Sequence, residues 1–219
     1  FRTEDVETLA LNGVDVHLRQ GEFVAVMGPS GCGKSTLLNI IGLLDSQSKG
    51  SYTFNGSDVT NLGEKEKTQL RRGNIGFIFQ SFNLIEELNI YDNVELPLLY
   101  LRVPASERFE RVHEVLEKFD LLARKRHFPQ QLSGGQQQRS AVARAVVTRP
   151  RLILADEPTG NLDSKTSQEI MALIDQLHQQ GQTIIMVTHE ADIAAHCERV
   201  IRLEDGRVES DIRQDKVSS

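Results

Sequence analysis

Residues 23–36 read FVAVMGPSGCGKST, an apolar run that passes directly into a glycine-rich turn. The run Phe23 to Met27 has the length and composition of a strand that is covered on both faces. The turn, Gly28 to Ser35, fits the pattern G-x-x-x-x-G-K-[ST]. Apolar residues at helical spacing then continue from Lys34 to Leu44. This stretch predicts a strand, a loop and a helix, the first unit of an α/β fold.

The glycine loop has the composition of a phosphate cradle. Glycines let successive backbone N–H groups point inward at phosphate oxygens, and the following helix N-terminus adds partial positive charge. We expect Lys34 to reach the β and γ phosphates, and the Ser35 hydroxyl to bind Mg²⁺. The nucleotide is expected to contact Gly28, Pro29, Ser30, Gly31, Cys32, Gly33, Lys34, Ser35 and Thr36.

A second apolar strand, from Leu152, ends in two adjacent acids, Asp156 and Glu157. Side chains alternate along a strand, so the two carboxylates cannot face the same way without a turn. We expect Asp156 to bind the Mg²⁺ ion and Glu157 to act as the base, or to orient water, in γ-phosphate hydrolysis.

The rest of the chain alternates between strand and helix patterns. This alternation predicts a largely parallel sheet with helices on both faces. A helix over 104–127 would bury a face that includes Phe109, and the residues after Ser210 are polar and expected to fray. Strands are expected at Leu9–Leu18, Ile75–Phe79, Arg151–Ala155 and Thr183–Thr188, hairpins at Ser51–Val59 and Val200–Val208, and helices at Gln137–Thr148 and Ser164–Gln180.

Composition excludes several classes of protein. The 219 residues suffice for one α/β domain, and 39% hydrophobic content is ordinary for a globular chain. A net charge of −6 argues against a nucleic-acid partner, and two cysteines suit a reducing compartment. There is no apolar run of about 18 to 20 residues, so we expect the chain to act at a membrane from the water side only.

Residues 132–136 read LSGGQ, a second small-residue loop just before a predicted helix. Together with the glycine loop and the acidic strand end, it resembles the nucleotide-binding domain of ABC transporters, over nearly the whole chain. The resemblance implies one domain over 1–219 with the P-loop NTPase fold. Residues 1–80 and 128–210 would form its core, with a mainly parallel sheet and a small antiparallel β part. Residues about 81–140 would form a helical insert with the signature loop, and 211–219 a polar tail.

Other positions match motifs of this family. Gln80 resembles the glutamine that contacts Mg²⁺ and the attacking water, and His189 resembles the switch histidine at the γ-phosphate. Asp163 would lie at a dimer seam. Phe1 falls where the family stacks an aromatic ring on adenine, although the strand that usually precedes it has no counterpart here.

The resemblance implies a head-to-tail dimer that closes around two ATP molecules and drives membrane subunits. Each ATP would contact the glycine loop of one copy and a signature loop of the other, namely Ser133, Gly134, Gly135 and Gln136. Residues 82–101 would form a groove for a membrane subunit, although their apolar side chains fit an internal core equally well. The chain would then lie at the cytoplasmic face of the inner cell membrane.

Longer strings resemble one branch of the family, the lipoprotein-release and macrolide-export ATPases with their cell-division relatives. Examples are residues 39–45 (NIIGLLD), 80–84 (QSFNL) and 155–163 (ADEPTGNLD). Two alternatives remain open: an ATPase relay that signals across the membrane, and a soluble ABC ATPase without a transporter. The absence of a long coiled-coil insert or a cysteine cluster disfavours the soluble class.

Overall fold

The computed structural model describes residues 10–214 of the chain. Its main sheet has the strand order β4-β5-β6-β1-β7-β8 and is parallel except for the edge pair β7 and β8. The strands are β1 (Phe23–Met27), β4 (Ile75–Phe79), β5 (Leu152–Asp156), β6 (Thr183–Val187), β7 (Arg199–Glu204) and β8 (Arg207–Arg213). A separate hairpin pairs β2 (Thr53–Phe54) with β3 (Ser57–Asp58). The predicted fold class is thus confirmed.

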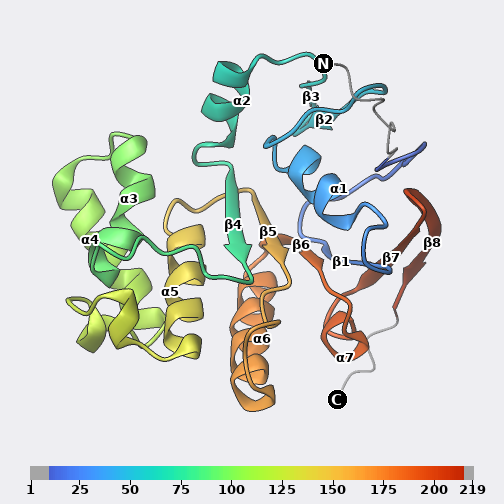
Figure 1. The fold of residues 1–219 in the computed structure, drawn as a ribbon. Helices are drawn as coiled ribbons and strands as arrows, with labels where there is room; N and C mark the ends of the chain where they lie inside the picture. The colour runs from blue at the N-terminus through green and yellow to red at the C-terminus, as the bar shows by residue number, and fades with distance from the viewer. Residues whose placement is uncertain (1–9, 215–219) are drawn as a thin grey trace, which may run out of the picture.

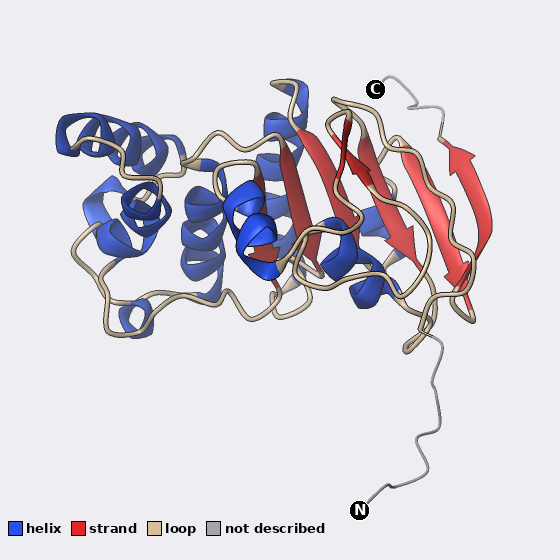
Figure 2. Cartoon of the chain, turned by 90° about the horizontal axis from the view of Figure 1, so that it is seen from above, coloured by secondary structure: helices blue, strands red, loops and turns tan. Residues whose placement is uncertain are grey.

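Helices cover both faces of the main sheet (Figures 1 and 2). Helix α5 lies beside β4, and α3 and α4 pack on the far side of α5 from the sheet (Figure 1). The α-helices are α1 (Lys34–Ile41), α2 (Glu64–Arg71), α3 (Ile90–Tyr100), α4 (Ala105–Lys118), α5 (Gly134–Val146), α6 (Ser164–Gln179) and α7 (Ala191–Ala194). Two 3₁₀ turns, Leu122–Arg124 and Pro129–Gln131, connect α4 to α5.

Two hydrophobic cores explain why the central strands read as continuous apolar runs. In β1, Phe23 and Ala25 join the core under α5 and α6, while Val24 and Val26 join the core under α1. Alternating residues of one strand thus enter opposite cores, as expected for a parallel sheet covered on both sides.

The expected strand over Leu9–Leu18 is wrong for its described part. Residues 14–18 alternate between half-buried and exposed positions, but residues 10–18 belong to no strand. Their backbone makes isolated contacts instead of a ladder: the Asn12 N–H donates to the Gly206 carbonyl at 2.6 Å, and the Arg199 guanidinium donates to the His17 carbonyl at 2.7 Å. Alternation here reflects packing on the β7–β8 hairpin rather than strand pairing.

Three other expectations need correction. The helix expected over 104–127 ends at Lys118, and a separate 3₁₀ turn, Leu122–Arg124, follows it. Phe109 is 56% exposed and packs against the His113 ring with centroids 3.9 Å apart, because it lies outside the buried stripe formed by Val112 and Leu116. The residues after Ser210 do not fray at once: β8 continues to Arg213, whose guanidinium donates to Glu22 Oε1 at 2.6 Å.

Helix α2 has no counterpart in the sequence prediction. Its eight residues, EKEKTQLR, contain one apolar side chain, so no hydrophobic period marks it. The Glu66 carboxylate accepts from the Gly63 N–H at 2.9 Å and holds the first turn instead.

Candidate functional site

The predicted site residues gather at one edge of the main sheet. Four parallel strands, β1, β4, β5 and β6, end there, and each is followed by one of the predicted residues or loops. The arrowheads of β4 and β5 in Figure 1 mark this edge. Ligands of open α/β sheets bind outside the carboxyl ends of the strands, so the topology makes this edge the candidate site.

A cavity of about 660 Å³ lies at this edge and joins residues that are distant in sequence. Its lining consists of Ala10, Gly28, Pro29, Ser30, Gly31, Gly33, Lys34, Ser35, Thr36, Glu157 and His189. The glycine loop, the residue after β5 and a residue just beyond β6 are therefore brought together. A volume of this size suits a small organic ligand.

Helix α1 begins in this cavity without a side-chain cap. Its N-cap residue is Gly33, with φ 103°, and its first turn contains no acidic residue. A Cβ atom at Gly33 would lie 2.3 Å from the Ala10 carbonyl oxygen, so the close approach requires glycine. The free N–H groups and the helix dipole make this end suited to an anion.

Lys34 folds back over the loop that carries it. Its ammonium donates to the Gly28 and Pro29 carbonyls, both at 2.8 Å, which keeps the charge at the cavity wall. Cys32 is 4% exposed and does not line the cavity; its thiol lies under the loop, 4.0 Å from the Lys34 ammonium.

Glu157 and His189 face the glycine loop across the cavity. The backbone of Glu157 is left-handed, with φ 46°, which supplies the turn that two adjacent acids need in order to face different ways. Its Oε1 atom lies 3.1 Å from Nδ1 of His189. A carboxylate and an imidazole in contact can hold and pass a proton.

Asp156 and Ser35 offer hard oxygen atoms of the kind that Mg²⁺ prefers. Burial raises the pKa of the Asp156 carboxyl, the neighbouring Glu157 raises it further, and Lys34 opposes both. A cation would relieve this unfavourable charge. Between residues 10 and 214, no group of three or more acidic, histidine or cysteine side chains is placed to hold a metal ion. Mg²⁺ commonly takes one or two protein ligands and completes its shell with phosphate and water. The residues present therefore fit Mg²⁺.

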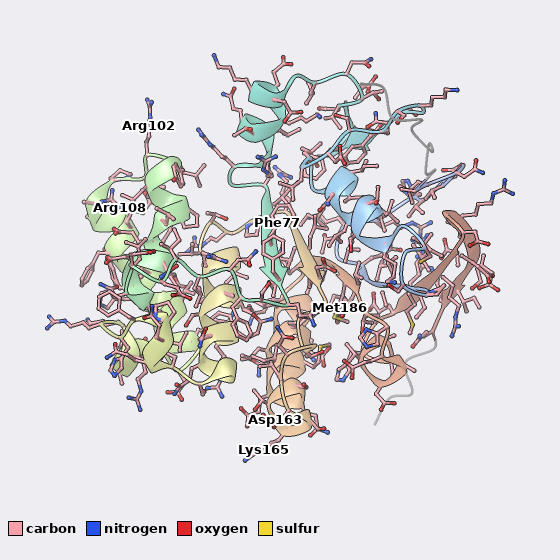
Figure 3. The ribbon with its side chains drawn as sticks, viewed as in Figure 1. Phe77, Arg102, Arg108, Asp163, Lys165 and Met186 are labelled. Atoms are coloured by element: carbon pink, nitrogen blue, oxygen red, sulfur yellow. The ribbon has the colours of Figure 1, made fainter. Side chains whose placement is uncertain are left out.

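Gln80 and Asp163 lie outside the cavity lining. Gln80 pairs with Asn161: its amide donates to Asn161 Oδ1 at 3.2 Å, and the Asn161 amide donates to the Gln80 carbonyl at 3.1 Å. Asp163 caps α6 by accepting from the Thr166 N–H at 3.1 Å and from its hydroxyl at 2.6 Å. Figure 3 labels Asp163 and Lys165 at the start of α6. Phe1 falls outside the described residues.

The signature loop begins α5 and also lies outside the cavity. Ser133 Oγ accepts from the Gln136 N–H at 3.3 Å, and Gln136 Oε1 accepts from the Ser133 N–H at 3.1 Å. This capping box starts the helix at Gly134, three residues before the expected start. In this cap the Ser133 hydroxyl acts only as an acceptor, so its proton can still be donated to another group.

The sequence analysis gave Gln138 no role and did not predict that Asn161 pairs with Gln80. Gln138 is fully buried in α5. The available signal was helical spacing, since Gln138 lies three and four residues before Ala141 and Val142 and so shares their buried face.

Comparison with known proteins identifies the family. The sequence profile described as "ABC transporter" matches residues 11–160. The chain belongs to the ABC transporter family. It is an ABC-type ATPase cassette, as residues 132–136 together with the glycine loop predicted.

Named relatives of the cassette are transport proteins. It is 50% identical to the macrolide export ATP-binding/permease protein MacB of Chlorobium luteolum, over 95% of this chain and 31% of that protein. It is 48% identical to the pyoverdine export protein PvdT of Pseudomonas aeruginosa, over 98% of this chain and 32% of that one. The cassette thus spans about a third of the length of these relatives.

Shorter relatives and solved structures match over most of their length. An uncharacterized ABC transporter ATP-binding protein of Thermotoga maritima is 48% identical over 94% of this chain and 88% of its own. The cassette MJ0796, solved as a dimer in a post-hydrolysis state bound to ADP and Pi, is 46% identical with a TM-score of 0.85, over 93% of this chain and 90% of its own. The predicted branch, which includes the macrolide exporters, is consistent with these relatives.

Proposed function

We propose that the cassette binds and hydrolyses ATP in order to drive membrane subunits of a transporter. One observation carries this proposal: the uncapped start of α1, Lys34, Glu157 and His189 line one cavity. Positive charge and free N–H groups on one wall suit the triphosphate, and a carboxylate on the opposite wall suits an attacking water.

Each residue has a definite task in this proposal. The Lys34 ammonium exchanges its two carbonyl acceptors for phosphate oxygens as nucleotide enters. Ser35 and Asp156 would hold Mg²⁺, which supplies charge neutralisation at the phosphates when bound. Glu157 takes the proton of the attacking water or orients that water, and His189 keeps the carboxylate in place through its 3.1 Å contact. Gln80 would contact the ion and the water once its pairing with Asn161 is released.

We further propose that two copies enclose two ATP molecules head to tail. The signature loop does not line the cavity of its own copy, so its Ser133 hydroxyl and α5 N-terminus are available to a second one. The dimeric state of MJ0796 supports this arrangement. Asp163 would lie at the seam, and Phe1 would stack on adenine.

The names of the relatives support an export role. MacB and PvdT combine an ATP-binding and a permease part in one protein, so we propose a membrane partner for this cassette and a position at the cytoplasmic membrane face. None of the helices between residues 10 and 214 is long and apolar enough to cross a bilayer. We propose that residues about 81–140 form a helical subdomain and that 82–101 carry the docking groove, because Leu99 and Tyr100 are 44% and 60% exposed there.

The variant Glu157→Gln tests the proposal. Removing a general base lowers the turnover number by about 10²- to 10⁴-fold while ATP still binds, so the variant should accumulate as an ATP-bound dimer. Turnover and size-exclusion chromatography with Mg-ATP measure both effects. Glu190→Gln is the control and should keep wild-type turnover, because this exposed carboxylate follows β6 and does not line the cavity. A Glu157→Gln protein that stays monomeric with full turnover would contradict the assignment.

A further inference from the structure

Gln138 joins two loops of the candidate site through a single buried amide. It lies in α5 and is 0% exposed. Its Nε2 donates to the Phe79 carbonyl at 3.3 Å and to the Pro158 carbonyl. Its Oε1 is buried and has no hydrogen-bond partner among the residues that the structure describes.

The two carbonyls flank residues with proposed roles in hydrolysis. Phe79 ends β4 and precedes Gln80, while Pro158 follows Glu157. The two strands are neighbours, since Phe79 pairs with Asp156 in the β4–β5 ladder. A displacement of the Gln138 amide would therefore act on both strand ends at once.

Helix α5 also contacts β4 and the Gln80 loop beyond the position of this amide. Near its C-terminal end it packs directly on β4, because a Cβ atom at Gly76 would lie 2.4 Å from the Ala145 carbonyl oxygen. Arg144 of the same helix donates to the carbonyls of Phe82 and Asn83, at 2.9 and 2.5 Å. Gln138 and Arg144 thus hold the Gln80 loop from both sides.

The unpartnered oxygen indicates why an amide occupies this position. A buried acceptor without a donor costs about 1 to 3 kcal/mol, which an apolar side chain of similar shape would avoid. An apolar side chain would instead leave the Phe79 and Pro158 carbonyls without this donor. The amide thus donates two bonds that an apolar side chain cannot supply, and its oxygen remains unsatisfied.

We propose that Gln138 is a positioning residue for ATP hydrolysis, which fixes the Gln80 loop and the Glu157 segment relative to the signature helix. The inference rests on the proposed function, because that function gives Glu157 and Gln80 their parts in the reaction. The inference also connects the signature loop to the hydrolytic residues within one copy, because Ser133–Gln136 begins the helix that carries Gln138. A second copy that engages this loop would therefore act on the hydrolytic residues of the first copy.

The test compares Gln138→Met with the neighbouring control Gln137→Met. Methionine keeps the shape and removes both donors. The Gln137 side chain donates to the Leu132 carbonyl, at 3.2 Å, and to no atom of the Gln80 loop or the Glu157 segment. We expect Gln138→Met to lower kcat by about 10- to 100-fold, the cost of a misplacement of roughly an ångström. The Kd for ADP, which reports the glycine loop, should stay within about twofold. Gln137→Met should keep wild-type kcat.

A second variant keeps the test decisive where Gln138→Met does not fold. Gln138→Asn keeps the amide but withdraws it by one methylene, so a lower kcat with unchanged Kd and melting temperature supports the proposal. Wild-type kcat in Gln138→Asn, or in a folded Gln138→Met, would overturn it. So would a loss of kcat that is matched by equal losses of nucleotide affinity and melting temperature, because that pattern belongs to a purely structural residue.

The wild-type protein separates this inference from the proposed function. A wild-type cassette without any ATPase activity would overturn the proposed function and this inference with it. An active wild type, a Glu157→Gln variant without turnover and an unaffected Gln138→Met variant would overturn this inference alone.

Discussion

Gly135 shows how tightly the signature loop is packed against the start of α6. A Cβ atom at this position would lie 2.5 Å from Cγ2 of Thr166, a branched and inflexible neighbour. We expect Gly135→Ala to destabilise the fold by about 1 to 3 kcal/mol, the usual cost of overpacking. Urea unfolding measures the change.

A double variant identifies the cause of this destabilisation. Thr166→Ser removes the clashing methyl group but keeps the hydroxyl that donates to Asp163, so Gly135→Ala combined with Thr166→Ser should recover most of the loss. Gly134→Ala is the matched control, because its nearest contact would be Leu162 at 3.3 Å. Equal stability of Gly135→Ala and wild type would show that the signature loop or Thr166 moves to accept the methyl group without cost.

Cys32 lies under the glycine loop, and bound nucleotide should hold that loop over it. The thiol is only 4% exposed, so alkylation requires the loop to open. We expect Mg-ATP to slow maleimide labelling of Cys32, and labelled protein to lose nucleotide binding, both followed by mass spectrometry and nucleotide titration. The fully buried Cys197 is the internal control, because it does not line the nucleotide cavity. Equal Cys32 labelling rates with and without Mg-ATP would contradict the expectation.

At the scale of elements, local patterns predicted most of the core. Strands β1 and β4, the β2–β3 hairpin and α6 follow from apolar runs, turn residues and helical spacing, which are properties of short segments. The prediction fails where contacts from elsewhere decide the structure. Residues 10–18 alternate like a strand but find no strand partner, and α2 is fixed by a capping carboxylate rather than by apolar spacing.

Charged pairs stabilise the end of the β7–β8 hairpin, and the sequence pattern did not predict them. Both carboxylate oxygens of Asp211 accept from Arg199, each at 2.6 Å. This hydrogen bonding lowers the pKa of Asp211 from its ordinary value of 3.8. The β8 residues past Ser210 thus belong to the strand although they are polar.

The lowered pKa of Asp211 predicts how the stability of the fold changes with pH. A carboxylate with a depressed pKa in the folded state adds stability above pH 3.8, its ordinary pKa, and this stability is lost as the pH falls below that value. We expect Asp211→Asn to be less stable than wild type at neutral pH and to approach wild type in acid. The difference should be about 1 kcal/mol or less, because the Asp211 side chain is 34% exposed. Urea unfolding at pH 7 and near pH 3 tests this. A difference that grows on acidification would contradict it.

At the scale of the whole molecule, the sequence identified most candidate site residues but not the contacts that join their segments. Motif order placed the glycine loop, Glu157 and His189 after separate strands, and parallel pairing brings those strand ends together at one cavity. The pairing of Gln80 with Asn161 joins the loops after β4 and β5, and the buried amide of Gln138 reaches both strand ends from α5. No local pattern encodes these contacts between distant segments.

Mixing two defective variants tests whether one nucleotide contacts two copies. Lys34→Ala removes the phosphate ligand of the cavity, and Ser133→Arg blocks the signature loop, so each homodimer should hydrolyse ATP poorly. A heterodimer keeps one complete site, built from the cavity of the Ser133→Arg copy and the signature loop of the Lys34→Ala copy. In a two-fold dimer with independent sites, equal mixing should restore about a quarter of wild-type turnover.

The control for this experiment mixes Lys34→Ala with the double variant Lys34→Ala/Ser133→Arg. No pairing of these two chains contains an intact cavity, so their mixture should stay as inactive as the parents. Ser133 lies outside the cavity lining of its own copy, and a substitution there can therefore block hydrolysis only through another copy or through α5. Mixing distinguishes these two routes. If Ser133→Arg acted through α5, it would disable the Glu157 segment of its own copy, and mixing would restore no turnover. Full turnover by Ser133→Arg alone would show that ATP is hydrolysed without this loop.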